Sequence, residues 1–177
     1  MTISKEYRDL NAQMHREMAH YGSGGFKAGG HVLTLIKRFK AESVLDWGAG
    51  KGTLKDYLRR YTPTKVQNYD PAVPEFSAPP EPADLVICTD VLEHVERPFT
   101  RDVLRGIADN TRKAAFLKIS LRPAKKCLPD GRNAHINLRS AIEWFNLVEE
   151  YMIVVCYELD VGRTVSIVAF PKGASDA

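Results

Sequence analysis

The stretch VLDWGAGKGTL, residues 44–54, decides the fold of this protein. Residues 43–47 form a short apolar run that predicts a buried strand, and apolar side chains at helical spacing predict a helix over residues 53–61. Three glycines lie between these elements, where bare backbone lets the chain bend sharply and lets a ligand approach closely. The start of the helix then presents free N–H groups to that ligand.

Two aspartates, Asp46 and Asp70, are expected to lie near this loop. Asp46 stands two residues before Gly48, and the glycine spacing is GxGxG rather than the GxGxxG of dinucleotide-binding loops. The difference favours a ligand without pyrophosphate that carries cationic groups near a carboxylate. Asp70 follows a predicted strand at residues 65–69, where an acid can accept hydrogen bonds from both hydroxyls of a ribose. An aspartate before Pro71 can also simply open a turn.

Strands alternate with helices along the rest of the chain, which is typical of a parallel sheet with helices on both faces. Strands are expected at residues 65–69, 84–89, 114–121, 152–157 and 164–170, and helices at 4–20, after 29–30, at 53–61, after a cap at Thr100 and after a capping box at Ser140. A short connection at residues 160–163 predicts that the last two strands form an antiparallel hairpin. The expected fold class is therefore α/β.

Length and composition indicate one folded domain. The chain has 177 residues, of which 44% are hydrophobic and 27% charged, so we expect a single domain over 1–177, with a helical lid at 1–40 and a core at 41–171. No apolar run approaches the roughly 20 residues that span a bilayer, and no signal peptide is evident. Three widely spaced cysteines form neither a metal nor a disulfide pattern. We expect a cytoplasmic monomer or homodimer without membrane association.

Three stretches resemble a known family. VLDWGAGKG (44–52), NYDPA (68–72) and DLVICTDVLEHV (84–95) look like the first, second and fourth motifs of the class I, Rossmann-like S-adenosylmethionine-dependent methyltransferases. The similarity covers roughly residues 20–170. Longer runs at 70–95 and 122–135 are similar to small uncharacterised methyltransferases of proteobacteria and their phages. The resemblance implies a Rossmann-like fold, S-adenosylmethionine as cofactor and methyl transfer as the reaction.

The resemblance also implies which residues hold the cofactor. The glycine loop would pack against its methionine part with Asp46 nearby, and Asp70 would hold the ribose. Tyr21 and Gly22 match a segment that often closes over the cofactor in this family. The full set of expected cofactor-binding residues is Tyr21, Gly22, Asp46, Gly48, Ala49, Gly50, Asp70, Pro71, Thr89, Asp90 and Val91.

One departure from the family is expected. Family members usually place helix, strand and helix between the second strand and the strand at 84–89, but residues 71–83 number only thirteen and include five prolines. A single parallel crossover takes about a dozen residues or more, so we predict that the third strand is missing and that about six strands remain. The adenine ring would then lie against residues 71–78 and the segment after Thr89, with Phe76 either stacking on it or anchoring the core.

Candidate catalytic residues follow the strand at 84–89. Asp90, Glu93 and His94 stand at i, i+3 and i+4, on one side of a helical turn and at the sheet edge where the methyl group is expected. His135 comes after the next strand and can face them across the cleft. A hydroxyl or amine acceptor must lose a proton, so the predicted catalytic residues are His94, His135 and Glu93. The remaining histidines, His15, His20 and His31, are expected at the surface or in loops.

The same residues suggest a metal site. Asp90, Glu93, His94 and His135 together could bind Mg²⁺ or Mn²⁺. This arrangement resembles the metal-dependent O-methyltransferases that act on RNA 3′ ends or on ubiquinone precursors, which usually have glutamate in place of Asp90. Many class I methyltransferases carry a similar LEHV segment without a metal. There Asp90 would help to position the amino end of the cofactor, and Glu93 and His94 would cap or pack the helix.

An irregular basic loop at residues 122–139 lies beside the expected active site. Its cationic side chains are Arg122, Lys125, Lys126, Arg132 and Arg139. They can attract a phosphorylated, carboxylated or nucleic-acid acceptor, although a charged loop can also be merely solvated. The net charge of +3 is too small to indicate nucleic acid by itself, and the loop lacks aromatics that would stack on bases. We expect methyl transfer to oxygen or nitrogen of an anionic small-molecule or nucleotide acceptor.

Other functions remain compatible with the glycine loop. A lyase or aminopropyl-transfer enzyme that uses S-adenosylmethionine could have the same fold. A non-catalytic S-adenosylmethionine-binding protein could have kept the loop without the reaction. A dinucleotide oxidoreductase is disfavoured by the GxGxG spacing.

Overall fold

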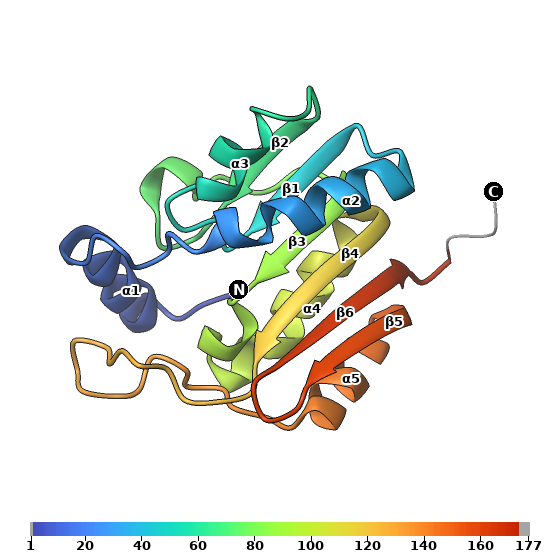
Figure 1. Cartoon of the computed structure of the whole chain (residues 1–177). Helices are drawn as coiled ribbons and strands as arrows, with labels where there is room; N and C mark the ends of the chain where they lie inside the picture. The colour runs from blue at the N-terminus through green and yellow to red at the C-terminus, as the bar shows by residue number, and fades with distance from the viewer. Residues whose placement is uncertain (1, 174–177) are drawn as a thin grey trace.

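The computed structural model describes residues 2–173, which form one six-stranded sheet with helices on both faces (Figure 1). The helices are α1 Lys5–Glu17, α2 Gly29–Phe39, α3 Thr53–Leu58, α4 Thr100–Asp109 and α5 Ala141–Glu149, and the 3-10 turns are Gly25–Ala28, Pro74–Phe76, Leu92–His94 and Arg97–Phe99. The strands are β1 Ser43–Trp47, β2 Lys65–Tyr69, β3 Ala83–Thr89, β4 Thr111–Ser120, β5 Met152–Asp160 and β6 Thr164–Pro171. Within this part of the chain, no helix is long and apolar enough to cross a bilayer.

The strands lie in the order β2-β1-β3-β4-β6-β5. Strands β1 to β4 run parallel, and β6 is antiparallel to both β4 and β5. The connection from β2 to β3 holds only the 3-10 turn Pro74–Phe76, and among residues 2–173 no strand lies beyond β2. The predicted mostly parallel sheet, the missing third strand and the antiparallel hairpin are therefore confirmed.

Two apolar cores cover the two faces of the sheet. Successive side chains of a strand point to opposite faces, so Val86 of β3 packs with Leu104 of α4 and Trp144 of α5, whereas Leu85 packs with Leu54 of α3. Figure 1 shows α2 on one face and α4 and α5 on the other. This packing fixes the carboxyl ends of β1, β2, β3 and β4 at one edge of the sheet.

Helix α1 lies beside that edge rather than on a face of the sheet (Figure 1). Ser4 caps it, because its Oγ accepts a hydrogen bond from the N–H of Tyr7 at 3.1 Å. Tyr7 and Met14 are buried against Leu128 and Ala134 of the long loop after β4. Helix α1 and this loop therefore form a third, smaller core next to the strand ends.

The capping predictions had mixed outcomes. Ser140 begins α5 with the predicted capping box, in which its Oγ accepts from the N–H of Glu143 and its own N–H donates to the Glu143 carboxylate. The prediction that Thr100 caps a helix was wrong, because Thr100 is the first helical residue and Phe99 is the cap. The buried Thr100 hydroxyl instead accepts a hydrogen bond from Asn137 Nδ2 at 3.0 Å.

Candidate active site

The loop between β1 and α3 is built on glycines in the left-handed conformation. Gly48, Gly50 and Gly52 have φ angles of 78°, 53° and 69°, which other residues adopt only with strain. A Cβ at Gly48 would collide with the side chain of Val91, and a Cβ at Gly50 would collide with the backbone of Gly22. The loop therefore has room for bare backbone only.

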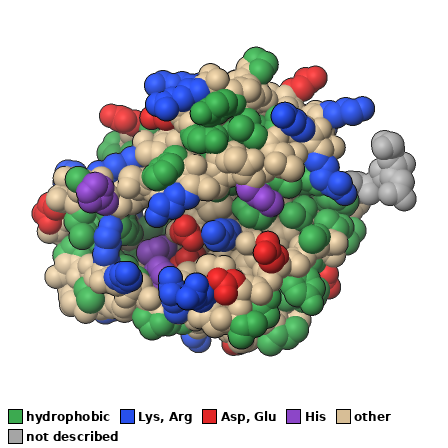
Figure 2. Space-filling view, viewed as in Figure 1, with side chains coloured by type: hydrophobic (Ala, Val, Ile, Leu, Met, Phe, Trp, Pro, Cys, Tyr) green, Lys and Arg blue, Asp and Glu red, His purple; other side chains and the backbone are tan. Residues whose placement is uncertain are grey.

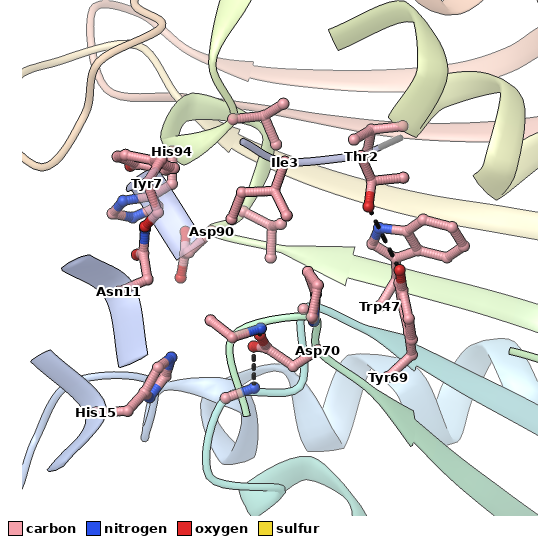
Figure 3. Close-up of a pocket in the computed structure, with 18 of the residues that line it drawn as sticks. Thr2, Ile3, Tyr7, Asn11, His15, Trp47, Tyr69, Asp70, Asp90 and His94 are labelled. Atoms are coloured by element: carbon pink, nitrogen blue, oxygen red, sulfur yellow. Dashed lines mark hydrogen bonds between the residues drawn. The ribbon is translucent and has the colours of Figure 1, made fainter. Parts of the chain in front are cut away.

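Asp70 follows β2 directly and faces the glycine loop (Figure 3). Its Oδ2 accepts a hydrogen bond from the N–H of Gly50 at 3.0 Å, and its Oδ1 accepts one from the N–H of Ala72 at 2.9 Å. Each carboxylate oxygen can accept a second bond. Asp70 is therefore fixed in place and retains acceptor capacity for a ligand.

Asp46, near the end of β1, is a buried acid without a hydrogen-bond partner for its Oδ2. Burial, with a further contribution from the charge of Asp70, raises the pKa of Asp46 to about 7. A positive charge brought by a ligand would offset both effects. This position therefore favours a cationic ligand group.

Two adjoining cavities open at the carboxyl ends of the strands. The residues that line both are Tyr21, Gly22, Gly48, Asp90 and His94. Asp70 lines only the first cavity and Asp46 only the second, so a ligand that contacts both acids must extend across the two. Every residue expected to bind the cofactor lines at least one cavity.

The segment after β3 enters both cavities. Asp90 has a φ of 57° and is held there by a hydrogen bond from its N–H to the carbonyl of Lys118 at 2.9 Å. Phe76, a predicted stacking or core residue, is not among the described residues that line the two cavities, and its ring lies beside Gly52. Phe76 is therefore placed as a packing residue of the glycine loop.

Glu93, His94 and His135 meet at the second cavity. One ligating atom from each lies within 4.8 Å of the others, and the two imidazole rings cross edge to face at 4.7 Å. Glu93 Oε1 accepts a hydrogen bond from the N–H of Ser120 at 3.0 Å, whereas Oε2 is buried without a partner. Burial raises the pKa of Glu93 to about 8 and lowers the pKa of His94 to about 4. At neutral pH a protonated carboxyl therefore adjoins a neutral imidazole.

The tautomer of His135 follows from its contact with the backbone. Its Nδ1 lies 2.6 Å from the carbonyl oxygen of Arg122. A carbonyl oxygen can only accept a hydrogen bond, so Nδ1 carries a proton, and in the neutral imidazole Nε2 is then the acceptor. Asp90, which the sequence groups with these residues, does not belong to the three-residue cluster.

The long loop after β4 brings part of its positive charge to the second cavity. The basic residues that line this cavity are Arg122, Lys125 and Lys126. In Figure 2, lysine and arginine side chains lie around a hollow in which acidic and histidine side chains are visible. Two other predicted basic residues are engaged elsewhere, since Arg132 pairs with Asp130 and Arg139 lies 5.6 Å over the ring of Trp144.

Helix α1 contributes cavity residues that the sequence analysis missed. Tyr7, Asn11 and His15 stand at i, i+4 and i+8 and line the first cavity (Figure 3). Tyr21 Oη donates a hydrogen bond to Asn11 Oδ1 at 2.6 Å, which ties α1 to the loop before α2. His15 was expected at the surface or in a loop, but it lies on α1, is half-buried, and has no hydrogen-bond partner for its Nδ1. The sequence signal that could have identified them is that polar residues share a face of α1 with apolar ones.

Comparison with known proteins identifies the family. Residues 11–151 match the family described as a methyltransferase domain. The chain belongs to this methyltransferase family. No protein with a curated description matches the sequence.

Solved structures share the fold of this methyltransferase. A Burkholderia thailandensis 1,6-didemethyltoxoflavin-N1-methyltransferase with bound S-adenosylhomocysteine is 16% identical, with a TM-score of 0.69 over 94% of this chain and 89% of that chain. An O-methyltransferase family protein from Burkholderia thailandensis is 14% identical, with a TM-score of 0.66 over 99% of this chain. The present chain spans only 65% of the length of that O-methyltransferase family protein. Human N-acetylserotonin methyltransferase in complex with S-adenosylmethionine is 16% identical, with a TM-score of 0.62 over 93% of this chain and 57% of that chain.

Proposed function

We propose that this methyltransferase uses S-adenosylmethionine to methylate an oxygen or nitrogen of a small-molecule or nucleotide acceptor. The observation that carries the proposal is the pair of acids on adjoining cavities, with Asp46 in one and Asp70 in the other. A ligand with a cationic amino-acid end and a ribose matches both acids. The two similar structures with S-adenosylhomocysteine or S-adenosylmethionine support the same choice of cofactor.

The residues present fit this cofactor. The unpartnered Asp46 would face its amino-acid end, Gly48 and Gly50 would line the cavity beside it, and Asp70 would hold its ribose hydroxyls. S-adenosylmethionine supplies an already activated methyl group. The task left to the protein is therefore chiefly to position the acceptor and to take up its proton.

The second cavity provides groups for the acceptor. In its neutral form His135 would present Nε2 as an acceptor, and His94 is a neutral imidazole at the boundary of the two cavities. We assign proton uptake to this pair, with Glu93 holding the histidine segment against β4 through Ser120. The lysines and arginine on the cavity wall favour an acceptor with a carboxylate or phosphate.

Titration calorimetry tests the cofactor assignment. S-adenosylhomocysteine should bind and NADH should not, because the loop lacks the dinucleotide spacing. Asp70→Ala should weaken S-adenosylhomocysteine binding at least about tenfold, the loss of more than one charged hydrogen bond. Asp56→Ala, an exposed acid of α3, is the matched control and should bind normally. Unchanged affinity in a folded Asp70→Ala protein would remove the ribose assignment.

Transfer of tritiated methyl groups tests the acceptor class. The panel contains phenols and amines, each with and without a carboxylate or phosphate. Anionic members should be methylated preferentially, and the double variant Lys125→Ala/Lys126→Ala should raise their KM while Lys65→Ala, an exposed lysine of β2, should not. Preference for neutral acceptors would contradict the anionic assignment. Cofactor binding with no transfer to any member would favour a non-catalytic S-adenosylmethionine-binding protein.

The three-residue cluster favours a second candidate, a metal-dependent O-methyltransferase that acts on RNA or a small molecule. Glu93 Oε2 and His94 Nδ1 are buried without hydrogen-bond partners, and a ligating atom of His135 lies within 4.8 Å of one on each of these residues. A divalent ion would satisfy both atoms. Two imidazoles with one carboxylate suit Mn²⁺ better than Mg²⁺, which prefers oxygen ligands.

Thermal denaturation after chelator treatment tests this candidate. Added Mn²⁺ should raise the melting temperature, and His135→Asn should abolish that shift. His31→Asn, a histidine outside the cluster, is the control. A melting temperature that does not respond to millimolar Mn²⁺ would remove the metal candidate.

Two further proposals concern the domain organisation of the protein and its cellular location. We place residues 1–40 as a lid on a core at 41–171 within one domain, because α1 contributes three cavity residues. The three cysteines of the chain are unpaired, which is consistent with a reducing, cytoplasmic location.

A further inference from the structure

The first cavity has an outer wall that the sheet does not provide. Its inner wall is apolar and aromatic, with Trp47 and Tyr69 from the ends of β1 and β2 and Val103 from α4. The short connection from β2 to β3 adds no α-helix to this wall. Thr2 and Ile3 lie across the opening instead (Figure 3).

Specific contacts hold this segment in place. Thr2 Oγ1 lies 3.4 Å from Tyr69 Oη, and the N–H of Ser4 donates a hydrogen bond to Glu96 Oε2 at 2.8 Å. Ser4 is also the cap of α1. Residues 2–4 are therefore tied to β2, to the segment before α4 and to α1 at once.

We infer that Thr2 and Ile3 form the outer wall of the pocket for the purine base, in place of the missing third strand and its helices. The inference rests on the proposed use of S-adenosylmethionine. Asp70 lines only the first cavity, so a base attached to the ribose that it holds must lie in or beside that cavity. Asp46 and the basic side chains line the second cavity, which leaves the first for the uncharged end of the ligand.

The chemistry of the first cavity matches a purine. A flat heteroaromatic ring buries its faces against apolar and aromatic side chains, here Trp47, Val91 and Ile3. The hydroxyls of Thr2 and Tyr69 can each donate or accept a hydrogen bond at the rim. The pocket therefore offers both stacking surface and polar groups for a base with ring nitrogens.

Calorimetry with 5′-methylthioadenosine, which has the base and sugar but lacks the amino acid, tests the inference. Ile3→Ala should weaken binding of this nucleoside and of S-adenosylhomocysteine by a similar factor, about tenfold, because apolar contact with the shared base is lost. Leu10→Ala, the same kind of truncation on α1 at a residue outside both cavities, is the matched control and should bind normally.

Two outcomes separate the possible failures. Normal binding of both ligands by Ile3→Ala, together with a raised KM for the acceptor, would place the segment at the acceptor and overturn the inference while leaving the proposed function intact. No binding of either ligand by the unaltered protein would overturn the proposed function itself.

Tryptophan fluorescence gives a readout that needs no variant of the segment. Trp47 lines the first cavity, whereas Trp144 is a buried residue of α5 that does not line it. Adding 5′-methylthioadenosine should therefore quench the emission, and Trp47→Phe should abolish the change. A folded protein that binds the nucleoside without any change in emission would place the base outside this cavity.

Discussion

Replacing Asp46 with asparagine should stabilise the ligand-free protein and weaken its hold on the cofactor. Asp46 is 4% exposed and its Oδ2 has no hydrogen-bond partner. Burial and the charge of Asp70 raise its pKa from 3.8 to about 7. Asparagine has nearly the same shape but carries no ionisable group, so the variant isolates the effect of the charge.

The sign and size of the effect follow from proton linkage. Between pH about 4 and 7 the folded protein keeps a proton that the unfolded chain releases, so stability is lost as pH rises through this window. The full pKa shift corresponds to about 4 kcal/mol, and relaxation and water penetration reduce the expected gain at pH 8 to about 2–4 kcal/mol. For a chain of this size the melting temperature of Asp46→Asn should rise by about 5–10 °C at pH 8. Near pH 4 the two proteins should melt together.

Circular dichroism melting from pH 4 to 9 without ligand measures this difference, and calorimetry with S-adenosylhomocysteine measures the loss of affinity. Asp84→Asn is the control of opposite sign. Burial is the largest single effect on the pKa of Asp84 and raises it. The hydrogen bond from the N–H of Glu42 and the pairing with Lys113 together outweigh burial and hold the pKa below its usual value. That variant should be less stable at pH 8. A melting temperature of Asp46→Asn at or below that of the unaltered protein at pH 8 would refute the reasoning.

Three further substitutions test local features. Gly50→Ala should lower the melting temperature and abolish S-adenosylhomocysteine binding in calorimetry, because a Cβ would collide with Gly22 at a positive φ; an unaltered melt and affinity would show that the loop relaxes freely. Ser140→Ala should reduce the urea-derived stability by about 1 kcal/mol through loss of the capping box, with no change in ligand affinity. Tyr21→Phe should reduce stability by about 1 kcal/mol, because Asn11 Oδ1 loses the hydroxyl that donates to it. An equal melting temperature would show that this hydrogen bond contributes nothing.

Much of the fold could be predicted because several local signals agree. The glycine loop separates a strand-like run from a helical one, and the predicted strands at 43–47 and 65–69 coincide with β1 and β2. Parallel strands bring their carboxyl ends to one edge, so Asp46, Asp70 and Asp90 could be placed together without knowing any side-chain position. The absence of the third strand was predictable from the length of one connection. Residues 71–83 are too few to hold the helix, strand and helix that family members usually place there.

The parts that could not be predicted depend on where α1 packs. Periodicity identified α1 as an amphipathic helix, but it does not say what its polar face meets. Tyr7, Asn11 and His15 became cavity residues only because the helix lies beside the strand ends, held by the loop after β4. The prediction that Thr100 caps a helix was wrong for a similar reason. Its hydroxyl accepts a hydrogen bond from Asn137, a residue distant in sequence.

The distribution of charge over the two cavities explains why the site retains costly groups. Asp46 is buried without a partner and Glu93 holds its proton only because burial raises its pKa, so neither contributes to stability as an ionised side chain. Groups of this kind are destabilising unless a ligand engages them. A cationic cofactor end would engage Asp46, while the basic wall of the second cavity would attract an anionic acceptor toward His135. Opposite charge requirements on neighbouring surfaces therefore specify two ligands that meet between them, as a methyl donor and its acceptor must.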